Sequence, residues 1–155
     1  MLSSQKPFYI LLADDDEDDC FLFKEALDEL DIKTQLSIVH NGEQLIKWLN
    51  NKELPHLLFM DLNMPRKNGM DCLIEIKGSE NFNNLPIIIY STSFQADVVD
   101  LLYKQGAQFY IRKPNKFLEL KNVIHNALTL AAELKYKQPS KENFVLSTGL
   151  IIETL

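Results

Sequence analysis

The stretch Phe8-Tyr-Ile-Leu-Leu-Ala-Asp-Asp-Asp16 joins an apolar run to three consecutive acids. The six apolar residues lack helical spacing, and a short run of this kind is typical of a strand buried on both faces. Beyond the acids, Cys20, Phe23, Leu27 and Leu30 recur at steps of three and four residues, as on the buried side of a helix. The stretch therefore predicts a buried strand that ends in acids and leads into a helix.

The same alternation of apolar run and amphipathic segment repeats along the chain. The other apolar runs are Gln35–Val39, His56–Met60, Ile87–Tyr90 and Phe109–Ile111. The segments that follow them carry Leu45, Trp48 and Leu49; Leu73, Ile74 and Lys77; Val98, Leu101 and Leu102; and Phe117, Leu120, Ile124, Ala127, Leu128 and Ala131. Strands that alternate with helices form a parallel sheet covered by helices on both faces. We therefore expect a doubly wound α/β fold of five βα units.

Charge, cysteine content and the length of the apolar runs exclude several classes of function. The chain has 155 residues, with 16 Lys and Arg against 22 Asp and Glu, so its net charge is −6 and one domain is expected. This acidic balance argues against direct nucleic-acid binding, which needs clustered basic residues. The two cysteines, Cys20 and Cys72, form no metal or redox motif. No apolar run approaches the ~20 residues of a membrane span, and the N-terminus has no apolar signal core, so a cytoplasmic protein is expected.

Four of the apolar runs end in residues that carry chemistry: Asp14-Asp-Asp16, Asp61, Ser91 and Lys113. In a doubly wound sheet, ligands bind at the carboxyl ends of the strands. Carboxylates gathered there repel one another, and Mg²⁺, which prefers oxygen ligands, relieves that repulsion. Mg²⁺, an ammonium group and a hydroxyl can neutralise a phosphoryl group, with one carboxylate as the nucleophile. The strand ends therefore predict phosphoryl chemistry.

Four motifs in this order and spacing resemble the receiver domain of two-component response regulators, the CheY-like family. They are Ile10-Leu-Leu-Ala-Asp-Asp-Asp16, Met60-Asp-Leu-Asn-Met-Pro65 with Gly69, Leu85-Pro-Ile-Ile-Ile-Tyr-Ser91, and Tyr110-Ile-Arg-Lys-Pro114. The resemblance covers about residues 6–134 and is closest in kind to single-domain regulators paired with bacterial phytochromes and hybrid kinases. It implies a flavodoxin-like (βα)₅ fold with a five-stranded parallel sheet of order 2-1-3-4-5.

The resemblance also implies roles for the acidic residues and their neighbours. Asp61 matches the phosphoacceptor, which also contacts the metal. Asp15 matches the direct Mg²⁺ ligand, and Asp14 the ligand that acts through water. The backbone carbonyl of Asn63 matches the third protein ligand. The implied cofactor is therefore Mg²⁺, held by Asp14, Asp15, Asp61 and Asn63.

Further matches concern the response to phosphorylation. Ser91 resembles the hydroxyl donor to the phosphoryl oxygen, Lys113 the invariant lysine and Tyr110 the aromatic switch residue. The Lys113–Pro114 peptide bond is usually cis in the family. Thr92 stands where small residues are common, and its bulk limits access of the hydrolytic water.

The partners follow from the same resemblance. A sensor histidine kinase or a phosphotransfer protein supplies the phosphoryl group, and the protein catalyses only its own phosphorylation and dephosphorylation. The output is expected through a downstream protein that contacts the face of the fourth helix, fifth strand and fifth helix. Neither nucleic acid nor membrane is expected as a partner, and a homodimer is one of the states to test.

Other interpretations of the acids stay open at this point. Acids are favoured at helix starts, so Asp16, Glu17, Asp18 and Asp19 are expected to be solvated there. The alternative enzyme is a haloacid-dehalogenase-type phosphatase, whose first strand ends in a D-x-D motif like Asp14-x-Asp16. That assignment leaves Asp61 unexplained. The alternative binding module is a pseudo-receiver that docks partners without being phosphorylated.

The C-terminal part follows a different pattern. We expect a receiver domain over residues 6–137 and an extension over 138–155 with no recognisable output domain. Residues 138–143 have the composition of a linker, whereas Phe144–Leu146 and Leu150–Ile152 are apolar. Large apolar side chains are rarely left exposed on soluble monomers, and sheet edges recruit strands. We therefore expect residues 144–155 to pack on the receiver or on a second copy, as a strand or short helix, with the fourth helix–fifth strand–fifth helix face as a candidate docking site.

Overall fold

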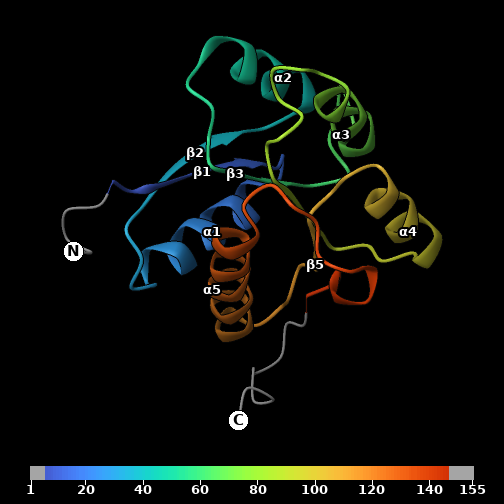
Figure 1. The fold of residues 1–155 in the computed structure, drawn as a ribbon. Coiled ribbons are helices and arrows are strands. Elements are labelled where there is room, and N and C mark those ends of the chain that lie inside the picture. Colours follow the sequence, from blue (N-terminus) through green and yellow to red (C-terminus); the bar gives the residue numbers. More distant parts are fainter. Residues whose placement is uncertain (1–5, 147–155) are drawn as a thin grey trace.

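The structure of the chain is a computed structural model that describes residues 6–146 (Figure 1). The strands are β1 (Phe8–Ala13), β2 (Thr34–Val39), β3 (Leu57–Met60), β4 (Ile87–Ser91) and β5 (Phe109–Arg112). The helices are α1 (Glu17–Asp28), α2 (Gly42–Asn51), α3 (Gly69–Lys77), α4 (Ala96–Lys104) and α5 (Phe117–Leu134). Each predicted strand and helix is therefore present.

The five strands form one parallel sheet of order β2-β1-β3-β4-β5. Helices α1 and α5 cover one face, and α2, α3 and α4 cover the other (Figure 1). This arrangement confirms the predicted doubly wound (βα)₅ fold and its strand order. Because β1 and β3 are neighbours in the middle of the sheet, their carboxyl ends lie side by side.

Burial on both faces explains why the strands are continuous apolar runs. Along β1, Ile10 and Leu12 pack beneath α1 and α5, whereas Leu11 and Ala13 pack beneath α2 and α3. A strand between two helical layers needs apolar side chains at every position. The strands are therefore packed on both faces, and this packing fixes the positions of their carboxyl ends.

Three of the expected apolar stripes include an exposed residue, namely Ile74 of α3, Leu101 of α4 and Phe117 of α5, and α4 illustrates the reason. Val99 and Leu102 are its buried residues, whereas Leu101 is exposed. The expectation that Leu101 belongs to the packed stripe is therefore wrong. Two apolar stripes overlap in this short helix, and apolar content alone did not fix which one faces the sheet.

The segment after α5 folds back onto the receiver. Residues 138–143 were predicted to be a linker, but they pack on the domain: Gln138 and Pro139 are hydrogen-bonded to it, and Lys141–Asn143 form a 3₁₀ helix. Phe144 and Leu146 are buried, and Val145 pairs in parallel with Tyr110 of β5. We call residues 138–146 the strap. The predicted packing is confirmed for Phe144–Leu146, while Leu150–Ile152 lies outside the described residues.

Two other expectations concern membranes and thiols. Within residues 6–146, no helix combines the length and the apolar character that crossing a bilayer requires. Cys20 and Cys72 are both buried free thiols, and they lie on opposite faces of the sheet. Burial raises the pKa of the Cys20 thiol to about 12, so this thiol is held in its neutral form.

Candidate functional site

The ends of β1 and β3 bring three carboxylates together. Asp14 and Asp15 directly follow β1, and Asp61 directly follows β3. The two strands are in register at Ala13 and Met60, and the Asp61 amide donates to the Ala13 carbonyl at 2.9 Å. One oxygen from each of the three carboxylates lies within 4.8 Å of the others. The predicted acidic cluster is therefore present.

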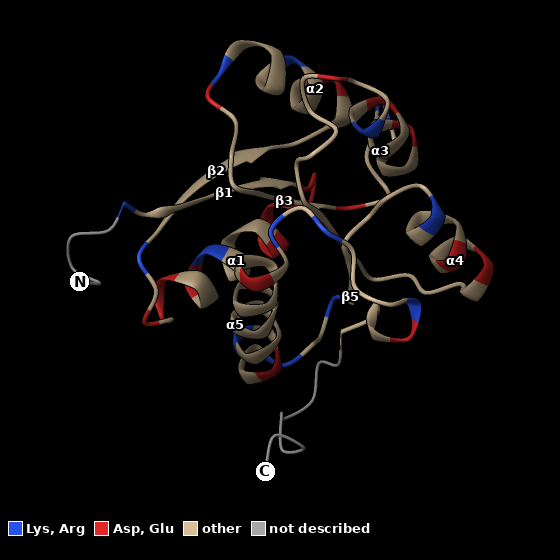
Figure 2. Cartoon of the chain, viewed as in Figure 1, with Lys and Arg blue, Asp and Glu red and all other residues tan. Residues whose placement is uncertain are grey.

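Lys113 is the cation of this cluster. Its Nζ lies 2.8 Å from Asp14 Oδ2, 2.9 Å from Asp19 Oδ2 and 3.1 Å from Asp61 Oδ2. Burial favours the neutral amine, but the contacts with Asp14 and Asp19 and the charge of Asp61 outweigh it, so the pKa of Lys113 is raised. Figure 2 shows the acidic strand ends beside the basic residues that follow β5. Lys113 is therefore held charged, facing the cluster.

Asp14 is the most deeply buried of the acids, with no exposed surface. Its Oδ1 accepts a hydrogen bond from the Asp16 amide at 3.0 Å. Its Oδ2 forms an ion pair with the ammonium group of Lys113, at 2.8 Å from Nζ. Burial raises the pKa of Asp14 to about 6, against the lowering effect of Lys113. Asp14 therefore contributes a buried carboxylate to the cluster, with the Lys113 ammonium group and the Asp16 amide as its partners.

The loop after β3 holds Asp61 in place. The Asn63 amide donates to Asp61 Oδ1 at 3.3 Å, while Lys113 donates to Oδ2. Gly69, the first residue of α3, donates its amide to the Leu62 carbonyl at 2.8 Å. The start of α3 thus packs directly against the backbone that carries Asp61.

Ser91 and Tyr110 lie on the β4–β5 side of the cluster. Ser91 is fully buried, and its hydroxyl lies 3.1 Å from the hydroxyl of Ser93. Its carbonyl accepts from the Lys113 amide at 2.7 Å, which ties the ends of β4 and β5 together. The Tyr110 hydroxyl donates to the Ser93 carbonyl. The Tyr110 phenol therefore points inward, toward the end of β4, and is not in solvent.

The donor set fits a divalent cation. Asp14, Asp15 and Asp61 present hard carboxylate oxygens, the ligands that Mg²⁺ prefers. One ammonium group faces these acids and Asp19, so negative charge remains in excess.

Two features differ from the sequence-based expectations. Asp19 was expected to be solvated, but α1 turns its carboxylate onto Lys113. Asp19 lies one turn beyond the helix cap Asp16, on the side of α1 that faces the end of β5. Which side of α1 faces β5 depends on the packing of the helix and could not be inferred from the sequence. The Lys113–Pro114 bond was expected to be cis, yet the described residues contain no cis peptide bond. The two forms of an X–Pro bond differ by only about 0.5–1 kcal/mol, so local contacts decide between them.

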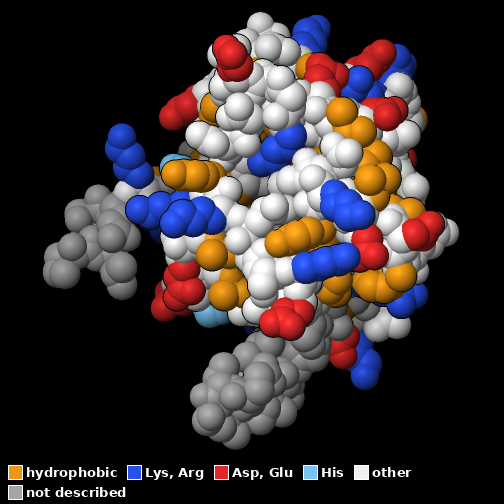
Figure 3. Space-filling model, turned by 45° about the vertical axis from the view of Figure 1, so that its right-hand side comes forward, with side chains coloured by type: hydrophobic (Ala, Val, Ile, Leu, Met, Phe, Trp, Pro, Cys, Tyr) orange, Lys and Arg blue, Asp and Glu red, His pale blue; other side chains and the backbone are white. Residues whose placement is uncertain are grey.

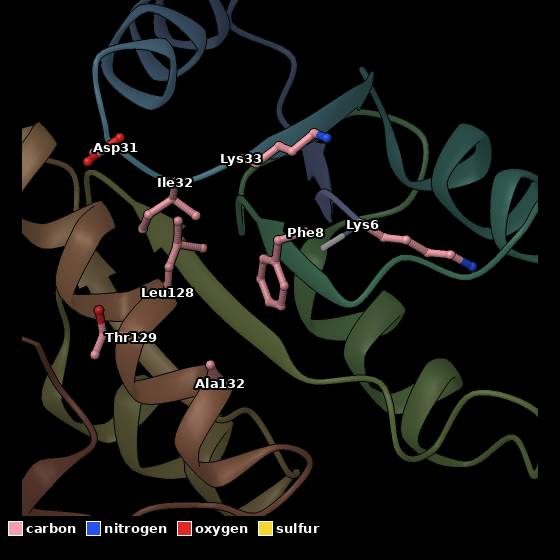
Figure 4. Close-up of a pocket in the computed structure, with 8 residues that line it drawn as sticks. All are labelled: Lys6, Phe8, Asp31, Ile32, Lys33, Leu128, Thr129 and Ala132. Carbon is pink, nitrogen blue, oxygen red and sulfur yellow. The ribbon is translucent and has the colours of Figure 1, made fainter. Parts of the chain in front are cut away.

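The surface has one hollow that adjoins the acidic site and another that lies away from it. One of about 380 Å³ borders Lys113 and is lined by Leu22, Thr92 and Phe117. Another, of about 330 Å³, lies between Phe8, where β1 begins, and Leu128 of α5 (Figure 4). The second hollow is at the amino end of the sheet, so it does not contribute to the acidic site.

The fold and this site define a receiver domain of the two-component type. Residues 10–125 match the family model described as "Response regulator receiver domain", and the chain belongs to this family. The match includes the three acids, Ser91, Tyr110 and Lys113 and ends within α5.

Relatives within the family agree with this assignment. The response regulator Rcp1 of Synechocystis is 30% identical over 123 residues, which is 76% of this chain and 84% of Rcp1. The probable methanogenesis regulatory protein FilR2 of Methanothrix harundinacea is 26% identical, over 80% of this chain and 83% of FilR2.

Solved structures agree as well. The Mn²⁺-bound form of Rcp1 superposes with a TM-score of 0.75 at 27% identity, covering 86% of this chain and all of that one. The phosphorylated cyanobacterial phytochrome response regulator RcpA gives 0.73 at 26% identity, covering 79% and 91%. The resemblance to phytochrome-type regulators is thereby confirmed.

Proposed function

We propose that Asp61 accepts a phosphoryl group from a phosphohistidine on a sensor histidine kinase or phosphotransfer protein. The observation that carries this proposal is the position of Asp61: its carboxylate lies at the end of β3 and faces Lys113, Asp14 and Asp15. An oxygen of Asp61 attacks the phosphorus and forms a new O–P bond. The P–N bond to histidine breaks, and its electron pair returns to the imidazole.

Lys113 neutralises charge on the transferred group. Its ammonium group already contacts Asp61 Oδ2, so it lies next to the place where phosphoryl oxygens arrive. Asp14, Asp15, Asp61 and the backbone carbonyl of Asn63 would hold Mg²⁺. When bound, the metal supplies positive charge for the phosphoryl oxygens. The solved Mn²⁺-bound form of the relative Rcp1 supports a divalent cation in this protein.

Ser91 and Tyr110 are proposed to report the phosphorylated state. The Ser91 hydroxyl turns from Ser93 toward a phosphoryl oxygen on Asp61, because a charge-assisted hydrogen bond is stronger than one between hydroxyls. Tyr110 is favoured in its inward position, where its hydroxyl meets the Ser93 carbonyl. The population then shifts between two packings of the α4–β5–α5 face, where a downstream protein binds.

A protein donor suits the surface beside the site. Leu22 of α1 and Phe117 of α5 are large apolar side chains that are exposed and line the hollow at Lys113. Exposed apolar groups around a polar site are typical of a protein interface. The expected histidine kinase or phosphotransfer partner, and a cytoplasmic location shared with it, are supported by this surface and by family membership.

The rival phosphatase does not suit the geometry. Its D-x-D motif requires Asp16 to act in the site, but Asp16 caps α1 by accepting from the Asp19 amide at 2.9 Å. The pseudo-receiver alternative requires an incomplete site. Here Lys113 contacts Asp61, and Asp14 and Asp15 lie beside it, which supports phosphorylation.

Intact-mass spectrometry tests the proposed function. Acetyl phosphate with Mg²⁺ should add one phosphoryl group to the wild type, and Asp61→Asn should abolish the addition. Asp71→Asn, an exposed acid in α3, is the matched control and should be labelled normally. Undiminished labelling of Asp61→Asn would contradict the assignment of the phosphoacceptor.

A further inference from the structure

The start of the strap is anchored to the end of α4. Gln138 Nε2 donates to the carbonyls of Tyr103 and Ala107, at 2.8 and 2.6 Å. The Tyr103 hydroxyl donates back to the Pro139 carbonyl at 2.6 Å. These contacts use side chains on both partners, so the strap is fitted to this part of the receiver.

The end of the strap extends the sheet. The Tyr110 amide donates to the Phe144 carbonyl at 3.0 Å, and the Leu146 amide donates to the Tyr110 carbonyl at 2.9 Å. Phe144 packs with the α4 side of the sheet and Leu146 with the α5 side, as alternate residues of a strand do. Figure 3 shows apolar and charged side chains interspersed over the α4 side of the molecule. The strap thus occupies the β5 edge.

Tyr110 is enclosed by this arrangement. Its ring meets Phe94 edge-on at 5.6 Å between centroids and Phe144 at 6.5 Å, and Phe144 in turn meets Tyr103 at 5.1 Å. Because β5 is the outermost of the five strands, the side of Tyr110 that faces away from β4 is the edge of the sheet. The strap and Phe144 lie across that edge, and Tyr110 is almost fully buried.

We infer that Phe144 is a positioning residue that holds Tyr110 turned inward, so that the strap and the phosphoryl group favour one another. The inference rests on the proposed function, which makes Tyr110 the residue that responds to phosphorylation. It adds that a segment beyond the matched family region sets the balance of this switch.

The coupling follows because phosphorylation of Asp61 and docking of the strap both favour the state in which Tyr110 points inward. A phosphoryl group on Asp61 favours the inward position of Tyr110, and the docked strap favours the same position. Coupling of this kind is reciprocal. If the phosphoryl group strengthens docking of the strap by a given factor, the docked strap strengthens binding of the phosphoryl group by the same factor. Loosening the strap should therefore weaken ligand binding at a site it does not touch.

Calorimetry on full-length variants tests this coupling. Beryllium fluoride with saturating Mg²⁺ serves as the acyl-phosphate mimic. Phe144→Ala should weaken its affinity by about fivefold or more, within the range of allosteric couplings. Phe144→Leu keeps most of the apolar volume and should restore part of the affinity. Mg²⁺ affinity, measured alone, should be the same in all variants.

Two further variants separate positioning from loss of stability. Leu49→Ala truncates a buried residue of α2, remote from the strap, and should lower the melting temperature while leaving beryllium fluoride affinity unchanged. Gln138→Ala removes the two anchoring hydrogen bonds without touching Tyr110 and should weaken affinity in the same direction as Phe144→Ala. In protein labelled with 3-fluorotyrosine, the Tyr110 resonance of Phe144→Ala should move toward a solvent-exposed position.

The outcomes distinguish the two proposals. Failure of the wild type to bind beryllium fluoride would overturn the proposed function and, with it, the inference. Wild-type binding with unchanged or tighter affinity in Phe144→Ala and Gln138→Ala would overturn the inference alone. Equal weakening by Leu49→Ala would also overturn it, because the effect would then reflect stability.

Discussion

Gly69 lies so close to the backbone of Asp61 that a Cβ placed on it would be 2.4 Å from the Asp61 carbonyl oxygen. Real Cβ atoms do not approach an oxygen so closely, and the neighbour is backbone that cannot move aside. The start of α3 and the proposed phosphoacceptor can therefore keep their present positions only if residue 69 has no side chain.

This contact predicts the effect of Gly69→Ala. The added methyl group should push the Asp61 loop away from Lys113 and slow labelling by acetyl phosphate about tenfold, with overpacking that lowers the free energy of unfolding by about 1–3 kcal/mol. Gly78→Ala, at the other end of α3, is the control, because its Cβ would meet its nearest atom at 3.2 Å. Similar labelling rates in the two variants would contradict the steric argument.

Mg²⁺ should stabilise the wild type through Asp15. Binding to the native state alone raises the free energy of unfolding by about 2.7 kcal/mol when the metal is at one hundred times its dissociation constant. Asp15→Asn should lose most of this gain in thermal melts. Asp18→Asn, an exposed acid in the first turn of α1, should retain it. If both variants gained as much as the wild type, Asp15 would not be a ligand.

Removal of Lys113 should destabilise the metal-free protein. Lys113→Ala leaves the buried carboxylates of Asp14 and Asp61 without their cation, a change that costs on the order of 3–5 kcal/mol in buried ion pairs. Lys121→Ala breaks a more exposed pair with Glu29 and should cost about 0–1 kcal/mol. Chemical denaturation measures both losses. Added Mg²⁺ should restore part of the stability of Lys113→Ala, and equal losses in the two variants would refute the buried-pair argument.

Lys77 should give the stability a distinct pH dependence. Its Nζ donates to the carbonyls of Asn83 and Leu85, and burial lowers its pKa to about 8. The unfolded chain therefore holds more protons at this residue between about pH 8 and 10.5, so folding becomes more favourable as the pH rises through that range.

Comparison with Lys77→Met isolates this effect. The wild-type free energy of unfolding should rise relative to the variant from pH 8 to 10.5. Lys47→Met, at an exposed position of α2, is the control for general lysine titration. A wild-type-to-variant difference that stays constant over this range would show that Lys77 titrates alike in both states.

The sequence was sufficient to predict the sheet and most of the site because both depend on local pattern. Strands buried on both faces are continuous apolar runs, and parallel strands bring their carboxyl ends to one edge. Asp14, Asp61, Ser91 and Lys113 each follow or end such a run, so their meeting place could be inferred without coordinates.

The remaining features depend on how helices are turned against the sheet. Asp19 meets Lys113 across 94 positions of sequence, and only the rotation of α1 decides which of its acids does so. The start of α4 illustrates the same limit. The helix begins at Ala96 after Gln95, whose side chain makes no capping hydrogen bond, so no cap residue marks that boundary in the sequence. Such choices are made by tertiary packing, which local propensity does not encode.

The position of the strap after α5 has a consequence for biosynthesis. A ribosome releases β5 before α5, and α5 before Val145, so the edge beside Tyr110 stays open until the nascent chain has passed the last turn of that helix. An uncovered edge strand can recruit a strand from another chain. The interval between synthesis of β5 and arrival of the strap is therefore the time when intermolecular pairing at this edge is most accessible, and slow translation over residues 117–146 would prolong it.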